Sequence, residues 1–466
     1  MTQLGTKKVT RRRCLQSALT ILPAGLARGY AANDRLDIGI IGVGGVGGVN
    51  ASKLTEFGQN VAALCDVDKR ILEKRAAEYP KAKRFTDFRK MIDKRKLDGV
   101  VVATPDHTHA FISIWAMRNG VNVYCQKPLT STVEEARFMR QVAAEEKVVT
   151  QMGTSSTASD ASMRTVELIR SGALGEITEV HCWSDRAVWP QGFSRPAGSE
   201  PPPATLNWDL WLGGAPERPF VSEWPAGHDV YKIPERIENA PYDWWREPWS
   251  RVYHPFTWRG WQDFGTGALG DIAPHSLNVV FWALDLGAPS SVEVVETSGL
   301  TKEMYPTWSV IRFDWPARGL HPPLTIYWYD GGAKPPLEVR GAEDSRAGLV
   351  WIGTKGSLPA ARGPFSGSSE TEYERPPERD WGREEVHLDW VKGVKKTAQP
   401  GCCFQYAGPF TEAYLLGNVA LRVGHVIEWN PLAFRVTNCR EANRYLTREY
   451  RKGWDLSQLG CRPIVS

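Results

Sequence analysis

Three side chains of this sequence could carry out proton and charge chemistry. Lys127 ends the apolar run VYCQKP and is followed by Pro128, whose ring restricts how the lysine is presented. Asp271 and His275 are four residues apart in GDIAPHS, so a helix would place them on one side. His275 could then take a proton while Asp271 orients and stabilises the imidazolium, and Lys127 could stabilise a developing oxyanion. The simpler alternatives are a surface lysine, a helix N-cap at Asp271 and a helix-surface histidine.

A glycine-rich turn upstream predicts a dinucleotide site. LDIGIIGVGGVG places Gly42, Gly44 and Gly47 between an apolar strand and a helical pattern, and Asp66 ends the next apolar run. In this context the carboxylate accepts hydrogen bonds from the adenosine ribose. A carboxylate there would repel a 2′-phosphate, so NAD is expected rather than NADP. The expected cofactor contacts are Gly42, Val43, Gly44, Val46, Gly47, Asp66, Thr104, Pro105, His109, Gln126 and Lys127.

The segment ATPDHTHA closes another predicted strand at Thr104 and Pro105. His109 either faces the cofactor or packs within the turn, and Asp106 or Thr108 could cap the following helix. His107 and His109 could also ligate a metal, but two imidazoles need at least one further ligand and the sequence offers no evident one. No metal site is therefore predicted.

Strand and helix patterns alternate through residues 33–152. The runs LDIGII, VAALCD, DGVVVA, VNVYCQ and KVVTQMG are apolar throughout, as is typical of strands buried on both faces. Repeated strand–helix–strand units predict an α/β, doubly wound parallel sheet, which is a Rossmann dinucleotide-binding domain. Ligands of such a sheet collect beyond the carboxyl ends of its strands, where Lys127 would lie.

Residues 153–466 predict a second, α+β domain for substrate binding and oligomerisation. EITEVHCWSD, SSVEVVETS, TWSVIRFDW, PLTIYWYD and AGLVWIGTKGSL have the pattern of an open, mostly antiparallel sheet. Pro274 predicts a helix that begins near Asp271, because proline is best tolerated in the first turn. Between the first two strands, a long segment contains nearly half of the 20 tryptophans, which could bind sugar rings or hold the loop together: Trp189, Trp208, Trp211, Trp224, Trp244, Trp245, Trp249, Trp258 and Trp261.

Composition and the first residues bear on location and partners. The 466 residues carry a net charge of +4 without long basic runs, so neither nucleic acid nor a membrane surface is suggested. No stretch has the roughly 20 apolar residues of a spanning helix.

Residues 1–32 have the basic, apolar and small-residue order of a twin-arginine export signal, which predicts a periplasmic protein. The alternative is a frayed basic tail. Seven cysteines follow Cys14, and one disulfide among the last four is compatible with their spacing.

Together, the glycine turn, TPDHTHA, the Lys-Pro strand end and the Asp271–His275 pair resemble the Gfo/Idh/MocA family of oxidoreductases, and YAGPFTEAYLLGNVALRVGHVIEWN resembles exported bacterial members. The resemblance implies catalytic roles for Lys127, Asp271 and His275 and a homo-oligomer, either a dimer or a tetramer. The family usually has Glu-Lys-Pro, whereas Gln126 stands here and removes a carboxylate beside the lysine.

The function expected from these features is hydride transfer between nicotinamide and a sugar or polyol hydroxyl. His275 would remove the hydroxyl proton and Lys127 would stabilise the resulting oxygen. Export implies a tightly bound cofactor, because free NAD is scarce outside the cytoplasm. Two alternatives remain: an NAD-dependent glycosidase or eliminase that oxidises the sugar transiently, and a non-catalytic sugar-binding protein.

Overall fold

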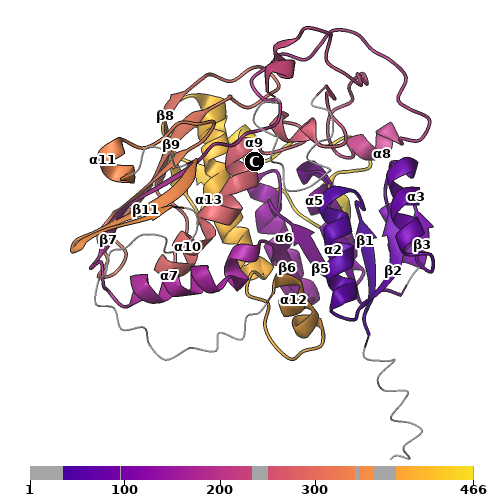
Figure 1. The fold of residues 1–466 in the computed structure, drawn as a ribbon, viewed down its shortest axis with the longest axis horizontal. Helices are drawn as coiled ribbons and strands as arrows, with labels where there is room; N and C mark the ends of the chain where they lie inside the picture. The colour runs from indigo at the N-terminus through magenta and orange to yellow at the C-terminus, as the bar shows by residue number, and fades with distance from the viewer. Residues whose placement is uncertain (1–34, 95, 234–249, 342–345, 362–384, 465–466) are drawn as a thin grey trace, which may run out of the picture.

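A six-stranded sheet and an eight-stranded sheet organise the chain (Figure 1). The computed structural model describes residues 35–94, 96–233, 250–341, 346–361 and 385–464. The predicted export signal at 1–32 and Trp244, Trp245 and Trp249 lie outside the described residues.

The first sheet confirms the predicted Rossmann topology. Its strands are parallel in the order β3-β2-β1-β4-β5-β6. Strands β2 and β3 therefore lie on one side of β1 and strands β4 to β6 on the other, which makes the β1–β4 boundary the topological switch point. The strand β3 was not predicted, because its sequence KRF is charged and mostly exposed at the sheet edge. The strands are β1 (Asp37–Ile41), β2 (Asn60–Cys65), β3 (Lys83–Phe85), β4 (Gly99–Val102), β5 (Asn122–Gln126) and β6 (Thr150–Gly153). The helices of this part are α2 (Gly45–Glu56), α3 (Lys69–Glu78), α4 (Phe88–Lys94), α5 (Asp106–Arg118) and α6 (Val133–Glu146).

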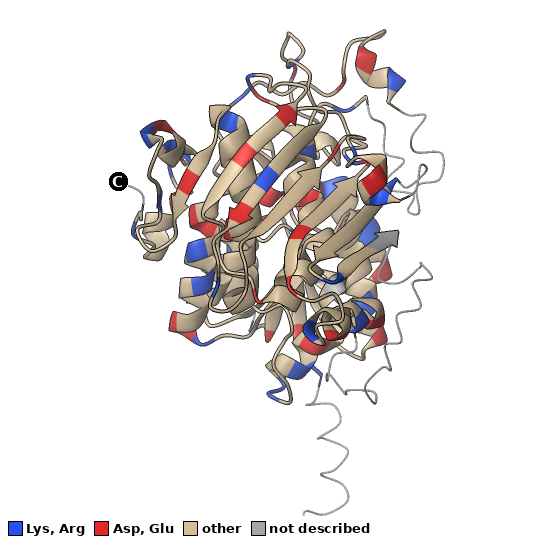
Figure 2. Cartoon of the chain, turned by 90° about the vertical axis from the view of Figure 1, so that its left-hand side faces the viewer, with Lys and Arg blue, Asp and Glu red and all other residues tan. Residues whose placement is uncertain are grey.

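The second sheet is mostly antiparallel, as predicted, in the order β12-β11-β7-β10-β9-β8-β13-β14. Among the described strands of this second sheet, only the β10–β7 pair is parallel. The run AGLVWIGTKGSL forms a hairpin of two strands. Figure 2 shows charged residues on several strands of this sheet. Glu293 pairs across neighbouring strands with Arg312. The strands are β7 (Ile177–Ser184), β8 (Ser291–Thr297), β9 (Ser309–Trp315), β10 (Leu324–Tyr329), β11 (Ala347–Gly353), β12 (Gly356–Ala361), β13 (Ile427–Asn430) and β14 (Arg435–Val436).

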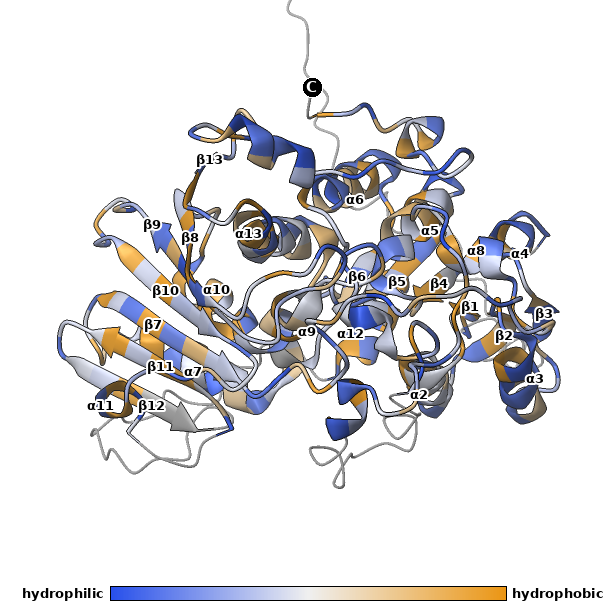
Figure 3. Ribbon diagram, turned by 90° about the horizontal axis from the view of Figure 1, so that it is seen from above, coloured by the Kyte–Doolittle hydropathy of each residue, from blue (hydrophilic) through white to orange (hydrophobic). Residues whose placement is uncertain are grey.

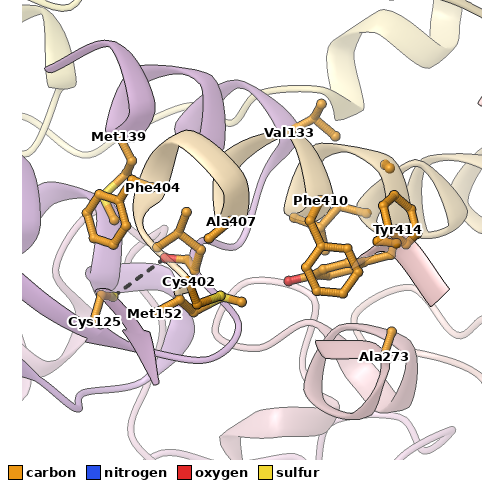
Figure 4. Packing of buried hydrophobic residues seen from close by; sticks show 14 of the residues in the cluster. Cys125, Val133, Met139, Met152, Ala273, Cys402, Phe404, Ala407, Phe410 and Tyr414 are labelled. Atoms are coloured by element: carbon orange, nitrogen blue, oxygen red, sulfur yellow. Dashed lines mark hydrogen bonds between the residues drawn. The ribbon is translucent and has the colours of Figure 1, made fainter. Parts of the chain in front are cut away.

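Helix α13 (Phe404–Val423) lies between the two sheets and joins their cores (Figure 3). Figure 4 shows its apolar side chains beside residues of β5, α6 and β6. Phe404 and Phe410 are almost fully buried in this cluster. The remaining helices are α7 (Asp160–Arg170), α8 (Trp208–Leu212), α10 (Asn278–Leu284), α11 (Leu337–Arg340) and α12 (Val386–Val394).

Helix α9 (Gly267–Ser276) carries Asp271 and His275, and it begins four residues earlier than predicted. Pro274 lies inside the helix, so the predicted start near Asp271 is wrong. Proline cannot donate a hydrogen bond to the preceding turn, and α9 ends two residues later. Helix α9 also packs on α13, and the hydroxyl of Thr154 donates to the Pro274 carbonyl at 3.0 Å, so tertiary contacts hold the end of the helix in place.

No helix in the described part of the chain is both long enough and apolar enough to cross a membrane. The seven cysteines after Cys14 are all described and all free. The structure therefore contains no disulfide among the last four of them.

Candidate functional site

The glycine turn after β1 is built so that only glycine fits at two of its positions. Gly42 has a φ of +79°, and a Cβ there would lie 2.6 Å from the Ala103 carbonyl oxygen. A Cβ on Gly47 would lie 1.8 Å from the carbonyl oxygen of Gly42. The start of α2 therefore packs directly on the turn, which is the arrangement that brings a phosphate close to the backbone.

Asp66 lies beside this turn at the end of β2, as predicted. Its carboxylate accepts the backbone N–H groups of Val43 and Asp68, each at 2.9 Å. Burial raises the pKa of Asp66, and the two backbone N–H groups oppose that shift. Asp66 thus fixes the turn and keeps further lone pairs for a ligand hydroxyl.

A cavity of about 340 Å³ opens over the glycine turn. The apolar walls, the glycine turn and Asp66 suit a dinucleotide. Seven of the predicted cofactor contacts line it: Gly42, Val43, Gly44, Val46, Asp66, Thr104 and Pro105. Four others, Gly47, His109, Gln126 and Lys127, are not among its walls.

The cavity is covered by residues that the sequence did not assign to the cofactor site. We call residues 189–261 the tryptophan-rich segment. Trp211, His254, Phe256, Trp258 and Arg259 of this segment line the cavity, together with Trp454 from the C-terminal part. The cover is therefore formed by segments far from the glycine turn in the sequence.

His254 fastens this segment to the first domain. The indole N–H of Trp211 donates to Nδ1 of His254 at 3.2 Å, and Nε2 of His254 lies 3.2 Å from Oδ2 of Asp68. Since Nδ1 accepts, Nε2 carries the proton that is donated to the carboxylate. Two backbone hydrogen bonds near Asp66 reinforce the attachment: the N–H of Asn207 donates to the carbonyl of Val67, and the N–H of Lys69 donates to the carbonyl of Thr205.

Most described tryptophans of the segment hold the loop together. Trp224 and Trp261 are buried in a separate apolar cluster with Tyr253. Trp208 stacks on Trp211 with ring centroids 4.7 Å apart. Only Trp211 and Trp258 of the described set line the cavity.

Lys127 and Asp271 meet where β5 ends. Nζ of Lys127 donates to Oδ1 of Asp271 at 2.9 Å and to its backbone oxygen at 3.0 Å. Nε of Arg259 lies 3.3 Å from the same Oδ1. Burial disfavours the charged carboxylate, but the two cations outweigh it and lower the pKa of Asp271 to about 2. Lys127 and Asp271 therefore lie together, as predicted from the sequence, whereas the contact of Arg259 with Asp271 was not predicted.

His275 is close to this ion pair but does not depend on Asp271 for its orientation. Within the described residues, its imidazole makes no side-chain hydrogen bond, and the predicted Asp271–His275 bond is absent because Asp271 turns toward Lys127 and Arg259. His275 is exposed, yet the surrounding protein desolvates its imidazole and, with nearby Lys127, lowers the pKa of His275. The imidazole is therefore unprotonated at neutral pH, and the same shift makes it a weaker base than an ordinary histidine.

His109 and Gln126 do not line the cavity and make their contacts elsewhere. The ring nitrogens of His109 lie 2.8 Å from the carbonyl oxygens of Thr104 and Pro128, which ties the ends of β4 and β5 together. Nε2 of Gln126 donates to Oδ1 of Asn50 at 3.1 Å. The carboxylate partner of Lys127 is thus Asp271, which supplies the charge that residue 126 lacks.

Asp106 is a buried carboxyl group that sequence analysis interpreted only as a helix cap. It is 1% exposed, and helix α5 begins at this residue without a side-chain cap, so the capping prediction is wrong. Oδ2 accepts the hydroxyl of Thr266 at 2.8 Å. Burial and the charge of Asp271 raise the pKa of Asp106 to about 7.

No cluster of three or more His, Cys, Asp or Glu suited to a metal occurs in the described residues.

Comparisons with known proteins find similar sequences for the first domain and similar folds for most of the chain. Residues 36–154 match the GFO_IDH_MocA model, described as "Oxidoreductase family, NAD-binding Rossmann fold". Inositol 2-dehydrogenase 4 of Saccharopolyspora erythraea is 29% identical over 35% of this chain and 49% of its own. Inositol 2-dehydrogenase 2 of the same organism is 31% identical over 42% of this chain and 55% of its own. The chain therefore spans about half the length of these curated relatives.

The fold is shared over a longer stretch. The WlbA dehydrogenase of Bordetella pertussis, solved with NADH and UDP-GlcNAcA, superposes with a TM-score of 0.57. The match covers 85% of this chain and 99% of the other at 16% identity. This likeness confirms the predicted architecture of a Rossmann domain followed by a sheet domain.

Proposed function

We propose that this chain, which belongs to the Gfo/Idh/MocA oxidoreductase family through its NAD-binding domain, oxidises a hydroxyl group of a sugar or polyol. The observation that carries the proposal is the Lys127–Asp271 pair with a neutral histidine nearby. Arg259 links that pair to the cofactor cavity, because it contacts Asp271 and also lines the cavity. The inositol dehydrogenases among the similar proteins support a polyol as substrate.

Gly42, Gly44 and Asp66 would hold the dinucleotide, and bound NAD would supply the hydride acceptor. Nζ of Lys127 has three protons, of which two are donated to Asp271. The third is available for a substrate oxygen, whose developing negative charge it stabilises.

His275 would accept the proton of the reacting hydroxyl group. His275 is exposed to solvent, and its lowered pKa keeps the imidazole unprotonated. A positioned general base contributes about 10²–10⁴ in rate, so the remainder must come from positioning of the substrate against the cofactor.

Product analysis tests this proposal against its alternatives. The protein would be incubated with NAD and a panel of sugars, polyols including myo-inositol, and glycosides, while NADH absorbance and product masses are followed. An oxidised product supports the proposal. A cleaved product without net redox change identifies a glycosidase or eliminase, and binding without any product identifies a sugar-binding protein.

We further propose that the cofactor is retained tightly. The support is the cover over the cavity, which His254 fastens to Asp68 next to Asp66. Release of the dinucleotide would require this cover to open, which favours a cycle in which the hydride returns to the same or a second substrate. Protein purified without added cofactor should release NAD on denaturation, as detected by mass spectrometry. An empty, folded protein would contradict tight retention.

Export to the periplasm is also a proposal, supported by the order of basic, apolar and small residues in 1–32. Osmotic-shock fractionation tests it, since retention in the spheroplast fraction would contradict it. The homo-oligomer implied by the family resemblance can be tested by light scattering, which should give at least twice the mass of one chain.

A further inference from the structure

A second cavity, of about 240 Å³, lies beside the start of α9. It is bounded by the N-terminal end of α6, by α13 and by residues 444–449. No residue lines both this cavity and the cofactor cavity. We call it the arginine cavity, after Arg422, Arg444 and Arg448 in its walls.

Two of these arginines are held by one aromatic ring. The guanidinium carbon of Arg422 lies 4.3 Å from the ring centroid of Tyr445, and that of Arg444 lies 4.6 Å from it. Arg444 also pairs with the exposed Glu441 at 2.9 Å. The stacking restricts both side chains while leaving N–H groups for a further acceptor.

Arg448 adds a third guanidinium with an unused donor. It donates to the hydroxyl of Ser131 at 3.3 Å and to the carbonyl of Asp263 at 3.0 Å. Its Nε is buried and has no hydrogen-bond partner. Two acidic residues also line the cavity, but the Asp263 carboxylate is ion-paired with Arg218. Glu449 in the wall and Glu441, which pairs with Arg444 from outside it, therefore oppose three arginines.

Asn418 provides an unpaired acceptor in the same cavity. The residue is 6% exposed, and its Nδ2 donates to the carbonyl of Thr266 at 2.9 Å. Its Oδ1 is buried without a partner. Because buried polar atoms are normally paired, this oxygen indicates a missing hydrogen-bond donor.

The N-terminal end of α6, which also borders the cavity, has no free N–H groups to offer a ligand. Its first N–H groups are occupied, since Thr132 and Glu135 form a capping box and the N–H of Glu134 donates to Leu446. The donors left for a ligand therefore belong to the arginines.

We propose that the arginine cavity binds a phosphorylated polyol. Guanidinium groups pair with phosphate oxygens, and a ligand hydroxyl would donate to Oδ1 of Asn418. The inference concerns a site apart from the cofactor cavity and does not depend on the proposed oxidoreductase activity.

Calorimetry on the full chain, saturated with NAD, tests this proposal. The probes are glycerol 3-phosphate, inorganic phosphate and glycerol. Glycerol 3-phosphate should bind one site per chain, more tightly than inorganic phosphate, and glycerol should not bind there. The double variant Arg422→Gln/Arg444→Gln should weaken binding at least tenfold. Arg440→Gln, which removes an exposed arginine of the same segment outside the cavity, should stay within about twofold.

The variant Asn418→Leu tests the contact with the ligand hydroxyl separately from the contact with the phosphate. It should reduce affinity for glycerol 3-phosphate and leave affinity for inorganic phosphate nearly unchanged. Absence of binding by the wild-type protein, or equal binding by the double variant, would overturn the site. Equal affinity of the wild type for both phosphates would overturn the assignment of a polyol.

Discussion

Replacing His254 with leucine should loosen the cover over the cofactor cavity and speed the release of bound dinucleotide. The substitution removes the hydrogen bond that joins the tryptophan-rich segment to Asp68 of the first domain, and it removes the acceptor of the Trp211 indole within the segment. The side chain of Asp68 is fully buried and that of His254 is 12% exposed, so solvent screens the bond to the carboxylate only weakly.

The size of the effect follows from the bond to Asp68, which must break when the segment leaves the first domain. A hydrogen bond to a charged group contributes about 1.5–3 kcal/mol. Asp68 keeps its contact with Arg70 at 2.8 Å, so the lower end, about 1.5 kcal/mol, is the better expectation. If release requires the cover to open, the dissociation rate should rise about tenfold, because about 1.4 kcal/mol corresponds to a factor of ten.

Stopped-flow fluorescence measures this rate directly. Protein loaded with NADH is mixed with excess NAD, and the loss of bound NADH fluorescence is followed. His228→Leu is the matched control, since it removes a histidine of the same segment whose ring lies outside the cavity walls. A folded His254→Leu variant that releases NADH within about threefold of the wild-type rate would refute the role of the cover.

Three further predictions concern the site itself. Asp66→Ala should narrow the preference for NAD over NADP at least tenfold, as measured by calorimetry, and equal affinities in the wild type would contradict the role of the carboxylate. Lys127→Met, Asp271→Asn and His275→Asn should each lower turnover, by about 10²–10⁴ for the histidine, without changing far-ultraviolet circular dichroism. Near wild-type turnover in His275→Asn would remove the proposed base. Because burial raises the pKa of Asp106 to about 7, from about 4 in the unfolded chain, the folded state loses stability as pH rises between these values. Asp106→Asn should flatten that part of the denaturation profile, and an unchanged profile would show that the group does not titrate there.

Features encoded by local sequence could be predicted. Gly42 and Gly47 follow from a turn in which neighbouring backbone atoms leave no room for a Cβ. Lys127 was placed correctly because the carboxyl ends of parallel strands share one edge of a sheet. Most strands of both sheets were predicted from their apolar residues, whereas the charged strand β3 and the short strands β13 and β14 were missed.

Features that depend on tertiary contacts could not be predicted. The spacing of Asp271 and His275 places them on one side of a helix, but it does not reveal that Lys127 and Arg259 compete for the carboxylate. In the same way, no local pattern shows that His254 reaches Asp68, which is 186 positions away in the chain. Pro274 was misjudged because packing of α9 stabilises a helix that proline alone would disfavour.

Transfer of a labelled hydride tests the central claim most directly. A substrate found in the panel would be prepared with deuterium on its oxidisable carbon and mixed with the protein in a single turnover, and the extracted cofactor would be weighed by mass spectrometry. The wild-type protein should place deuterium in the reduced nicotinamide, and Lys127→Met should greatly reduce this transfer. Conversion of the labelled substrate with no deuterium in the cofactor at any time would contradict hydride transfer to NAD.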